Sequence, residues 1–365
     1  MNINLSREEL NYAINMVQRA ISARSPIGIL DGILMEAKDN TLSLTGYDTK
    51  KAIICTIPAT VSTAGRIVLR SRLIADIVRR LPEDRVFIKK EQGPVVLRSG
   101  KAKFEIDYLD GEYPALPEVQ RDYHVKISQD TLKSMIENSI FSASTDPSRP
   151  ILNGLNFRFS NNDLQVVAID GFRMARQRAK IKYDAEDREL NIPAPALQEL
   201  ARVLDKTDDP IDIYSSDQFI LFDNGKVKLI SILLNGNYID YKDIVPKQFM
   251  TSMIIDRQTF LDAVERSSLV INFEMKRDPI TLESIGESTL KISARTEVGT
   301  AEEEIPCQLS GEAVDIDFNP RYLTDALRMI SDDEIKLSFA GTGTSLLIEA
   351  LEGDEYLYLI LPVRR

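Results

Sequence analysis

Ile29-Leu30-Asp31-Gly32-Ile33-Leu34, followed by Thr45-Gly46-Tyr47-Asp48-Thr49, begins a pattern that occurs three times along the chain. The pattern returns as Ile151-Leu152-Asn153-Gly154-Leu155 with Ala168-Ile169-Asp170-Gly171-Phe172, and more weakly as Pro279-Ile280-Thr281-Leu282 with Ser293-Ala294-Arg295-Thr296. Its period is about 120 residues, far longer than the roughly 20 to 50 residues of a solenoid repeat. The repetition therefore predicts whole domains in tandem.

A second motif, a short strand that leads into a helix, accompanies each copy of the first. It covers residues 67–78, 192–200 and 318–327. A chain of 365 residues is long enough for three domains of ordinary size. We therefore predict three similar domains, over residues 1–122, 123–250 and 251–365.

The composition is that of a globular protein, with 43% hydrophobic and 28% charged residues. No stretch approaches the roughly 18 apolar residues of a membrane helix, and the N-terminus runs into a strand pattern without a signal sequence. We expect a cytosolic protein with no membrane partner. Cys55 and Cys307 lie in different repeats within apolar runs, which predicts two buried free thiols.

Apolar residues at helical spacing predict two helices in each domain, and each repeat is expected to open with the first of them. The ranges are residues 6–20, 70–80, 128–141, 194–206, 256–268 and 319–330. Alternating runs between them predict strands, so the expected fold class is α+β, with two helices backed by an antiparallel sheet in each domain. The net charge is −11, yet the six helices together carry 13 basic and 11 acidic residues. The acidic total argues against a protein that coats nucleic acid over its whole surface, but a local basic face remains compatible with it.

Residues arranged for catalysis are scarce. His124, the single histidine, lies at the first domain junction with no nucleophile or recurring acid near it in sequence. Gly100-Lys101 lacks the rest of a phosphate-binding loop and is interpreted as a hairpin turn, and Asn224-Gly225-Lys226 occupies the same place in the second repeat. The acidic clusters Asp208-Asp209, Glu302-Glu303-Glu304 and Asp332-Asp333 are typical of solvated turns and strand edges. We expect no metal, no cofactor and no enzymatic activity.

Several motifs, in their order and spacing, resemble the bacterial DNA polymerase III β subunit, the sliding clamp family. They are residues 42–48, 149–154, 168–175, 318–322 and 361–364, and the resemblance runs from Met1 to Arg365. It implies DNA-clamp domains, a head-to-tail homodimer that closes into a ring of six domains, and a processivity factor that encircles duplex DNA without reading its sequence. It also implies a protein of the bacterial cytoplasm, associated with the replisome and the nucleoid.

The same resemblance implies that arginines near the helices touch DNA phosphates. The residues expected are Arg24, Arg72 and Arg149, followed by Arg79, Arg80 and Arg202. Ordinary solvated arginine is the alternative for each. Weak contacts suffice for a ring that holds DNA topologically.

A second surface implied by the resemblance is an apolar pocket for short linear motifs of the DNA polymerase III catalytic subunit, the clamp loader, other DNA polymerases and repair proteins. Its expected lining is Leu152, Ile169, Gly171, Phe172, Arg173, Met174, Ile239, Ile244, Asn319, Tyr322, Ser345, Leu359, Ile360, Leu361, Pro362, Val363 and Arg364. This chain departs from some members at Phe172, Ile239 and Asp243, which leaves the preferred motif open. The terminal segment is also interpretable simply as a final strand.

For the dimer joint, the resemblance implies Phe104 and Ile106 on one subunit against Leu269 and Val270 on the other. All four are apolar and can equally belong to the core of their own domains. Two other functions stay open at this point: a specialised clamp paralogue, and a carboxylate- or metal-dependent hydrolase that uses the acidic clusters.

Overall fold

The computed structural model describes residues 1–22, 25–121, 123–182, 186–271, 278–341 and 343–364. The chain folds into two compact units, and each is built from two separate stretches of sequence. The first unit comprises Met1–Asp130 and Arg202–Leu233, and the second comprises Thr131–Ala201 and Leu234–Arg365.

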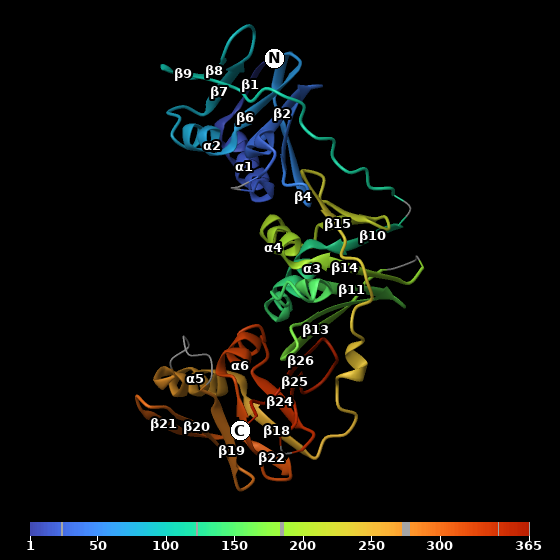
Figure 1. Cartoon of the computed structure of the whole chain (residues 1–365), viewed down its shortest axis with the longest axis vertical. Coiled ribbons are helices and arrows are strands. Elements are labelled where there is room, and N and C mark those ends of the chain that lie inside the picture. The colour runs from blue at the N-terminus through green and yellow to red at the C-terminus, as the bar shows by residue number, and fades with distance from the viewer. Residues whose placement is uncertain (23–24, 122, 183–185, 272–277, 342, 365) are drawn as a thin grey trace. The chain divides into compact units, whose positions relative to one another are not determined.

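One order of elements recurs three times along the chain (Figure 1). The first repeat contains β1 Asn2–Ser6, α1 Arg7–Val17, η1 Gln18–Ala20, η2 Gly28–Asp31, β2 Gly32–Lys38, β3 Thr41–Tyr47, β4 Lys51–Pro58, β5 Thr60–Thr63, β6 Gly65–Arg70, α2 Ser71–Arg79, β7 Arg85–Lys89, β8 Val95–Ser99 and β9 Ala102–Ile106. The second contains β10 Tyr123–Ser128, α3 Gln129–Glu137, η3 Ile140–Ser142, η4 Pro150–Asn153, β11 Gly154–Ser160, β12 Asp163–Ile169, β13 Arg173–Lys180, β14 Arg188–Pro193, α4 Ala194–Val203, β15 Pro210–Ser215, β16 Phe219–Asp223, β17 Val227–Ile232 and η5 Tyr241–Asp243. The third contains β18 Thr251–Asp256, α5 Arg257–Ser267, η6 Ser268–Val270, β19 Ile280–Ile285, β20 Thr289–Arg295, β21 Thr300–Pro306, β22 Gln308–Gly311, β23 Asp315–Phe318, α6 Pro320–Leu327, β24 Glu334–Phe339, β25 Leu346–Ala350 and β26 Tyr356–Ile360.

The six predicted helices are confirmed, and each begins within one residue of the expected position. Polar caps explain the sharp starts. The Ser6 hydroxyl accepts a hydrogen bond from the Glu9 amide at 3.4 Å, and the Asp256 carboxylate accepts one from the Thr259 amide at 2.7 Å. Among the described residues, no helix combines the length and apolar character needed to cross a membrane.

The expectation that each repeat opens with a helix was wrong, because a strand precedes each first helix. The side chains that alternate inward along these strands are buried: Ile3 and Leu5 in β1, Val125 and Ile127 in β10, Met253 and Ile255 in β18. Five or six residues with this period are enough for a strand that adds to an existing sheet. Because each of these strands is short and directly precedes a helix, the sequence pattern did not separate the strand from the helix.

All the strand pairs of the first unit are antiparallel, and they form two sheets. One has five strands in the order β5-β1-β7-β8-β9, and the other has eight in the order β10-β15-β16-β17-β4-β3-β2-β6. The helices α1 and α2 contact each other, and α1 packs on β3 and β4.

The second unit repeats this arrangement with a nine-stranded and a four-stranded sheet. The orders are β14-β11-β12-β13-β26-β25-β24-β18-β22 and β21-β20-β19-β23. The helices α5 and α6 contact each other, and Phe260, Val264 and Leu323 join an apolar core with residues of both sheets. The α+β class and the antiparallel sheets predicted from the sequence are therefore confirmed.

Corresponding strands make the two junctions between successive repeats. Strands β4, β13 and β21 hold the same place in their repeats, as do β9, β17 and β26. Strand β17 pairs with β4, with Leu229 opposite Ile53, and β26 pairs with β13, with Leu359 opposite Met174. In the described part of the chain, β9 and β21 each keep one edge without a partner strand.

The turn at Asn224-Gly225-Lys226 anchors the first junction, and the predicted hairpin there is confirmed. The Lys226 ammonium lies 2.9 Å from a Glu9 carboxylate oxygen and 4.3 Å from the centre of the Tyr12 ring, both on α1. Cys55, on β4 in the same junction, is buried and free, and burial raises its pKa to about 11. The thiol is therefore neutral at physiological pH and packs as a small apolar group.

Candidate functional site

The apolar residues expected in the peptide pocket come together in the second unit. Leu152, Ile169, Met174 and Leu359 are buried in one cluster, against which the half-buried Ile244 packs. They come from η4, β12, β13, β26 and the segment after η5. The sequence interpretation thus selected residues that are far apart in the chain but share one layer.

Tyr238 belongs to the same cluster and is absent from the expected lining. Its hydroxyl accepts a hydrogen bond from the Ile169 amide at 3.1 Å and donates one to the Gly154 carbonyl at 3.3 Å. Burial raises the pKa of Tyr238 well above its ordinary value, so the hydroxyl stays protonated. The sequence shows an aromatic segment after Gly236, but it does not show that Tyr238 bonds to Ile169 and Gly154, because these residues are distant in the chain.

Above this layer, the turn between β12 and β13 carries an exposed aromatic ring. The Asp170 carboxylate accepts hydrogen bonds from the amides of Phe172 and Arg173 at 2.9 and 3.0 Å, while Gly171 takes a φ of +95°. The turn leaves Phe172 58% exposed, with its ring stacked on that of Tyr322 at 6.4 Å between centroids. We call Phe172 and Tyr322 the aromatic rim.

Arg173 ties this rim to two other elements. Its guanidinium donates to Asp170 at 3.0 Å, to Asp325 on α6 at 2.6 Å and to the Phe141 carbonyl in η3 at 2.6 Å. It also lies 4.5 Å from the centre of the Tyr322 ring, and its side chain is only 10% exposed. A buried guanidinium needs such a set of acceptors, and in return it fixes their positions.

The C-terminal segment is hydrogen-bonded next to the aromatic rim. The Leu361 amide donates to the Phe172 carbonyl, and the Val363 amide donates to the Asp317 carbonyl, each at 2.8 Å. Asn319 is occupied as the cap of α6, where its side chain accepts from the Arg321 amide at 3.0 Å. Of the other expected residues, Ser345 and Ile360 are buried, Pro362 and Val363 are half-buried, and Ile239, Leu361 and Arg364 are exposed.

Arg149 lies beside this site. It immediately precedes η4, its Nε is 3.5 Å from an Asp146 carboxylate oxygen, and a Cβ added to Gly171 would be 3.0 Å from its Nη1. Its surroundings are therefore those of the aromatic rim, and it does not belong to any of the six helices. Sequence reasoning had grouped it with the phosphate contacts.

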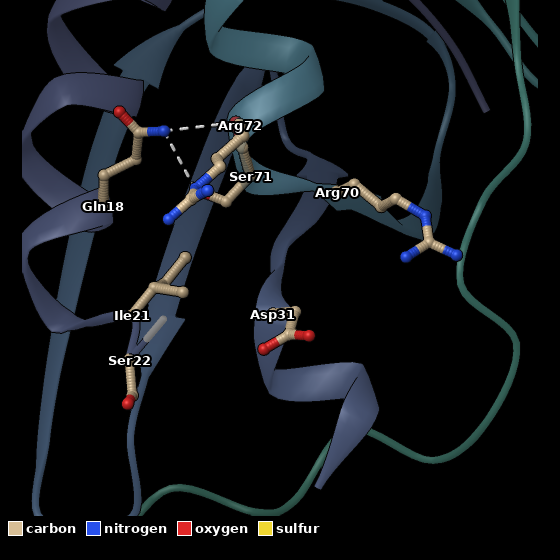
Figure 2. A pocket seen from close by; sticks show the side chains of 7 residues that line it. All are labelled: Gln18, Ile21, Ser22, Asp31, Arg70, Ser71 and Arg72. Carbon is tan, nitrogen blue, oxygen red and sulfur yellow. Dashed lines mark hydrogen bonds between the residues drawn. The ribbon is translucent and has the colours of Figure 1, made fainter. Parts of the chain in front are cut away.

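The remaining arginines expected at DNA begin with Arg72, in the first turn of α2. It lines a cleft of about 340 Å³ together with Gln18, Ile21, Ser22, Asp31, Arg70 and Ser71. Figure 2 shows these side chains. Gln18 closes one wall by donating to the carbonyl and the hydroxyl of Ser71, at 3.1 and 2.9 Å. Arg70, which the sequence interpretation missed, also lines this cleft, but its guanidinium points away from that of Arg72.

Arg79 and Arg80 at the other end of α2 both pair with Asp76. Arg202 is exposed near the end of α4, and Arg24 lies outside the described residues. Because exposed ion pairs exchange readily, Asp76 does not prevent Arg79 and Arg80 from meeting another anion.

The four residues expected at the dimer joint differ in exposure. Phe104 is 37% exposed and Ile106 is buried, and both project from the same face of β9. Leu269 is 82% exposed in η6, while the neighbouring Val270 packs on the core of the third repeat. Phe104 and Leu269 are thus free to contact another molecule, whereas Ile106 is buried and Val270 packs on a core.

In the folded chain, His124 has beside it an acid that is distant in sequence. It lies in β10, 2.5 Å from an Asp212 carboxylate oxygen, and stacks on Tyr214 with 4.7 Å between ring centres. The acid comes from β15, so it could not be seen near His124 in sequence. Within the described residues, no group of His, Cys, Asp and Glu side chains is arranged to hold a metal ion.

Comparisons with known proteins agree with this architecture along the whole chain. Models of the N-terminal, central and C-terminal domains of the DNA polymerase III beta subunit match residues 1–117, 126–240 and 242–364. The beta sliding clamp of Bacillus subtilis (strain 168) is 34% identical over 378 residues, covering 100% of both chains. That of Staphylococcus epidermidis strain RP62A is 33% identical over 375 residues, covering 100% of this chain and 99% of the relative.

Among solved structures, the DNA polymerase sliding clamp from Bacillus subtilis superimposes with a TM-score of 0.97 at 33% identity, covering 100% of this chain and 99% of that one. Matches of this extent and identity include all three repeats. The chain therefore belongs to the DNA polymerase III beta subunit family, and its function is that of a DNA sliding clamp, a non-catalytic accessory factor.

Proposed function

We propose that two copies of this chain join head to tail into a closed ring of six domains that encircles duplex DNA. The pairing of corresponding strands carries this proposal. Strands β17 and β26 already pair with β4 and β13, and among the described residues the third pair of the series, β9 with β21, does not form. A partner's β21 beside β9 would supply it and would cover both free edges.

The apolar residues next to these edges favour the same joint. Phe104 and Leu269 together leave large apolar surfaces to water in a single subunit. Burial of a side chain of this size contributes about 1.5–3 kcal/mol. The joint thus gains apolar burial as well as strand pairing, which is what a stable homodimer requires.

A mass measurement in solution tests ring formation. At micromolar concentration we expect a particle of twice 41.1 kDa, since two chains supply six domains. A monomer at every concentration up to 100 times higher would contradict the ring.

The domain limits that we propose are 1–122, 123–250 and 251–365. The recurrence of strand, helix, strands, helix and strands in each interval supports them, as do the three ranges matched by the family models. Each junction sheet then combines strands from two successive domains.

Contacts with DNA are assigned, as part of the proposal, to exposed arginines of the helices. Arg72 is the best supported by its surroundings, because it is exposed on the wall of an open cleft that Arg70 also lines (Figure 2). Arg79, Arg80, Arg202 and Arg24 remain proposals, and Arg149 is retained with the qualification that it lies beside Gly171. Weak, exchangeable phosphate contacts are suited to a ring that slides.

We further propose that the aromatic rim and the apolar layer beneath it bind short motifs of the DNA polymerase III catalytic subunit, the clamp loader, and other polymerases and repair proteins. The exposed Phe172 ring and the half-buried Tyr322 ring, next to a buried apolar layer, suit a peptide anchored by one or two large side chains. Bound at replication forks in this way, the protein would work on the bacterial nucleoid.

A labelled clamp-binding segment of the catalytic subunit tests this site. Phe172→Ser should weaken its binding about tenfold, whereas Phe249→Ser, which also removes an exposed ring in the same unit, should leave it unchanged. Equal binding by both variants would remove the rim from the proposal.

A further inference from the structure

The sheet β5-β1-β7-β8-β9 carries an unusual outer face in the first unit (Figure 1). Along β7, Val86 and Ile88 are buried, while Arg85, Phe87 and Lys89 are exposed. Successive side chains of a strand point to opposite faces. The three exposed residues therefore lie together on the side away from the core, and Phe87 keeps 48% of its surface in water.

The register of the sheet places a cation beside Phe87 on the β8 side, whereas its neighbour on β1 is the neutral Asn4. Phe87 lies opposite Arg98 on β8, and Arg98 lies opposite Lys103 on β9. Side chains directly opposite each other in neighbouring strands have Cβ atoms about 4.5–5.5 Å apart. Half-buried Val96 lies opposite Lys89 on the same face. We call Arg85, Phe87, Lys89, Val96, Arg98 and Lys103 the Phe87 patch.

The charge of the patch is opposite to that of the chain, whose net charge is −11. Two of its four cations are already paired, Lys89 with Glu91 at 2.8 Å and Lys103 with Glu105 at 2.5 Å. In the described part of the chain, no carboxylate lies within salt-bridge distance of Arg85 or Arg98. These two guanidiniums flank Phe87 and are available to bind carboxylates in the two-pronged geometry that arginine favours.

We propose that the Phe87 patch is a docking surface for an extended, acidic segment of a protein partner, with Phe87 and Val96 receiving one apolar side chain of that segment. Residues two apart in an extended peptide are about 6.7 Å apart, which is the spacing of successive outward residues on β7. Carboxylates at alternate positions of the partner would thus face Arg85 and Lys89 while an apolar side chain between them meets Phe87.

The charges at the margin of the patch favour a peptide over single-stranded nucleic acid. Glu91 and Glu105 stand at two of its sides. A nucleic acid carries a negative charge on every unit and would meet these carboxylates, whereas a peptide can place a neutral or basic residue there. Stacking of one base on Phe87 would be favourable, but only one ring is present for it.

The inference goes beyond the proposed function and does not depend on it. Strand β8 separates β7 from the edge strand β9, so Arg85 and Phe87 lie about 10 Å, two strand spacings, from the proposed dimer joint. The patch belongs to the first unit, and every residue of the aromatic rim belongs to the second. Variants of the Phe87 patch and variants of the aromatic rim can therefore be tested separately for loss of peptide binding.

The test is binding of the full chain to a labelled nine-residue peptide with aspartates at alternate positions on both sides of a central leucine, followed by fluorescence anisotropy. We expect binding that weakens about tenfold in Phe87→Ser and in Arg85→Glu, and that weakens as salt is raised. Lys38→Glu reverses an exposed lysine in the same unit and should leave the affinity unchanged. The same peptide with asparagine in place of aspartate should not bind.

Circular dichroism of each variant checks that the fold is intact, and Arg85→Glu serves if Phe87→Ser does not fold. No binding of the aspartate peptide at 1 mM, equal binding by the patch variants and the Lys38→Glu control, or equal binding of the asparagine peptide would each overturn the proposal. An oligothymidine that binds more tightly than the peptide and is lost in the same variants would overturn it in favour of single-stranded nucleic acid.

Discussion

Arg173 illustrates how one residue can hold a binding surface in place. It is largely buried, yet it meets Asp170, Asp325 and the Phe141 carbonyl, which belong to three different elements. Removing one acceptor from a buried guanidinium leaves charge without compensation. The positions of Phe172 and Tyr322 therefore depend on a carboxylate that does not itself belong to the expected site.

Asp325 is predicted to act as a positioning residue. Asp325→Ala should lower the affinity for the polymerase-derived peptide about tenfold, since Arg173 loses its α6 partner and the aromatic rim loosens; tenfold corresponds to about 1.4 kcal/mol. Asp325→Asn, which keeps a hydrogen-bond acceptor, should recover part of the loss. Arg328→Ala breaks an exposed pair with Glu265 in the same repeat and is the matched control. An unchanged affinity in Asp325→Ala would show that Arg173 does not need Asp325.

The cap at Asp256 predicts a dependence on pH. Its hydrogen bonds with Thr259 hold the pKa of the Asp256 carboxyl below its ordinary value, so the ionised form is favoured by folding. The stabilisation is present above the unfolded pKa of about 3.9 and is lost as the pH falls through the folded pKa. Asp256→Ala should therefore cost about 1 kcal/mol of local stability near neutral pH and much less in acid.

Hydrogen exchange at the start of α5 is the suitable measurement, because a chain of several domains does not have a single free energy of unfolding. At pH 7 the amides of the first turn should exchange about fivefold faster in Asp256→Ala than in the unchanged chain, and the ratio should fall toward one as the pH is lowered through the folded pKa of Asp256. Asp262→Ala on the same helix should have a smaller effect. A ratio that is independent of pH would contradict the capping role of the carboxylate.

At the scale of elements, the helices were predictable and the strand junctions were not. Capping residues such as Ser6 and Asp256 act within three residues of their targets, so the sequence places the helix starts closely. The pairs of β17 with β4 and of β26 with β13 join residues far apart in the chain, and no local pattern specifies which edge meets which. Tyr238 and Asp325 were missed for the same reason, since their partners come from distant segments.

The strand pairs at the junctions place the proposed dimer joint at β9 and β21, and Leu269 in η6 is expected to contribute to it. Leu269→Asp should convert the proposed dimer into a monomer of 41.1 kDa, because a carboxylate would be buried in the joint without a partner. Secondary structure should be unchanged, since Leu269 is 82% exposed in the single chain. Sedimentation equilibrium measures the effect, with Leu351→Asp as a control at another exposed leucine of the same repeat. A dimer of unaltered affinity would contradict the assignment of Leu269 to the joint.

For the whole molecule, repetition has a geometric consequence. The pairs of β17 with β4 and of β26 with β13 join three domains in one chain. A corresponding pair of β9 with a partner's β21, formed twice, would join two chains into a closed ring. The charge distribution suits such an object, because the helices are nearly neutral while the remainder of the chain carries the excess acid. Repulsion from the acidic parts and screening within about 8 Å at physiological salt would leave DNA weakly held and free to slide.

Retention on DNA of different topology tests this ring most directly. The protein is loaded by its clamp loader onto a nicked circular plasmid, and the amount that travels with the DNA through a gel-filtration column is measured before and after one cut by a restriction enzyme. We predict retention on the circle, loss after the cut, and recovery when bulky proteins block both ends of the linear DNA. Equal retention on circular and on open linear DNA would contradict encirclement.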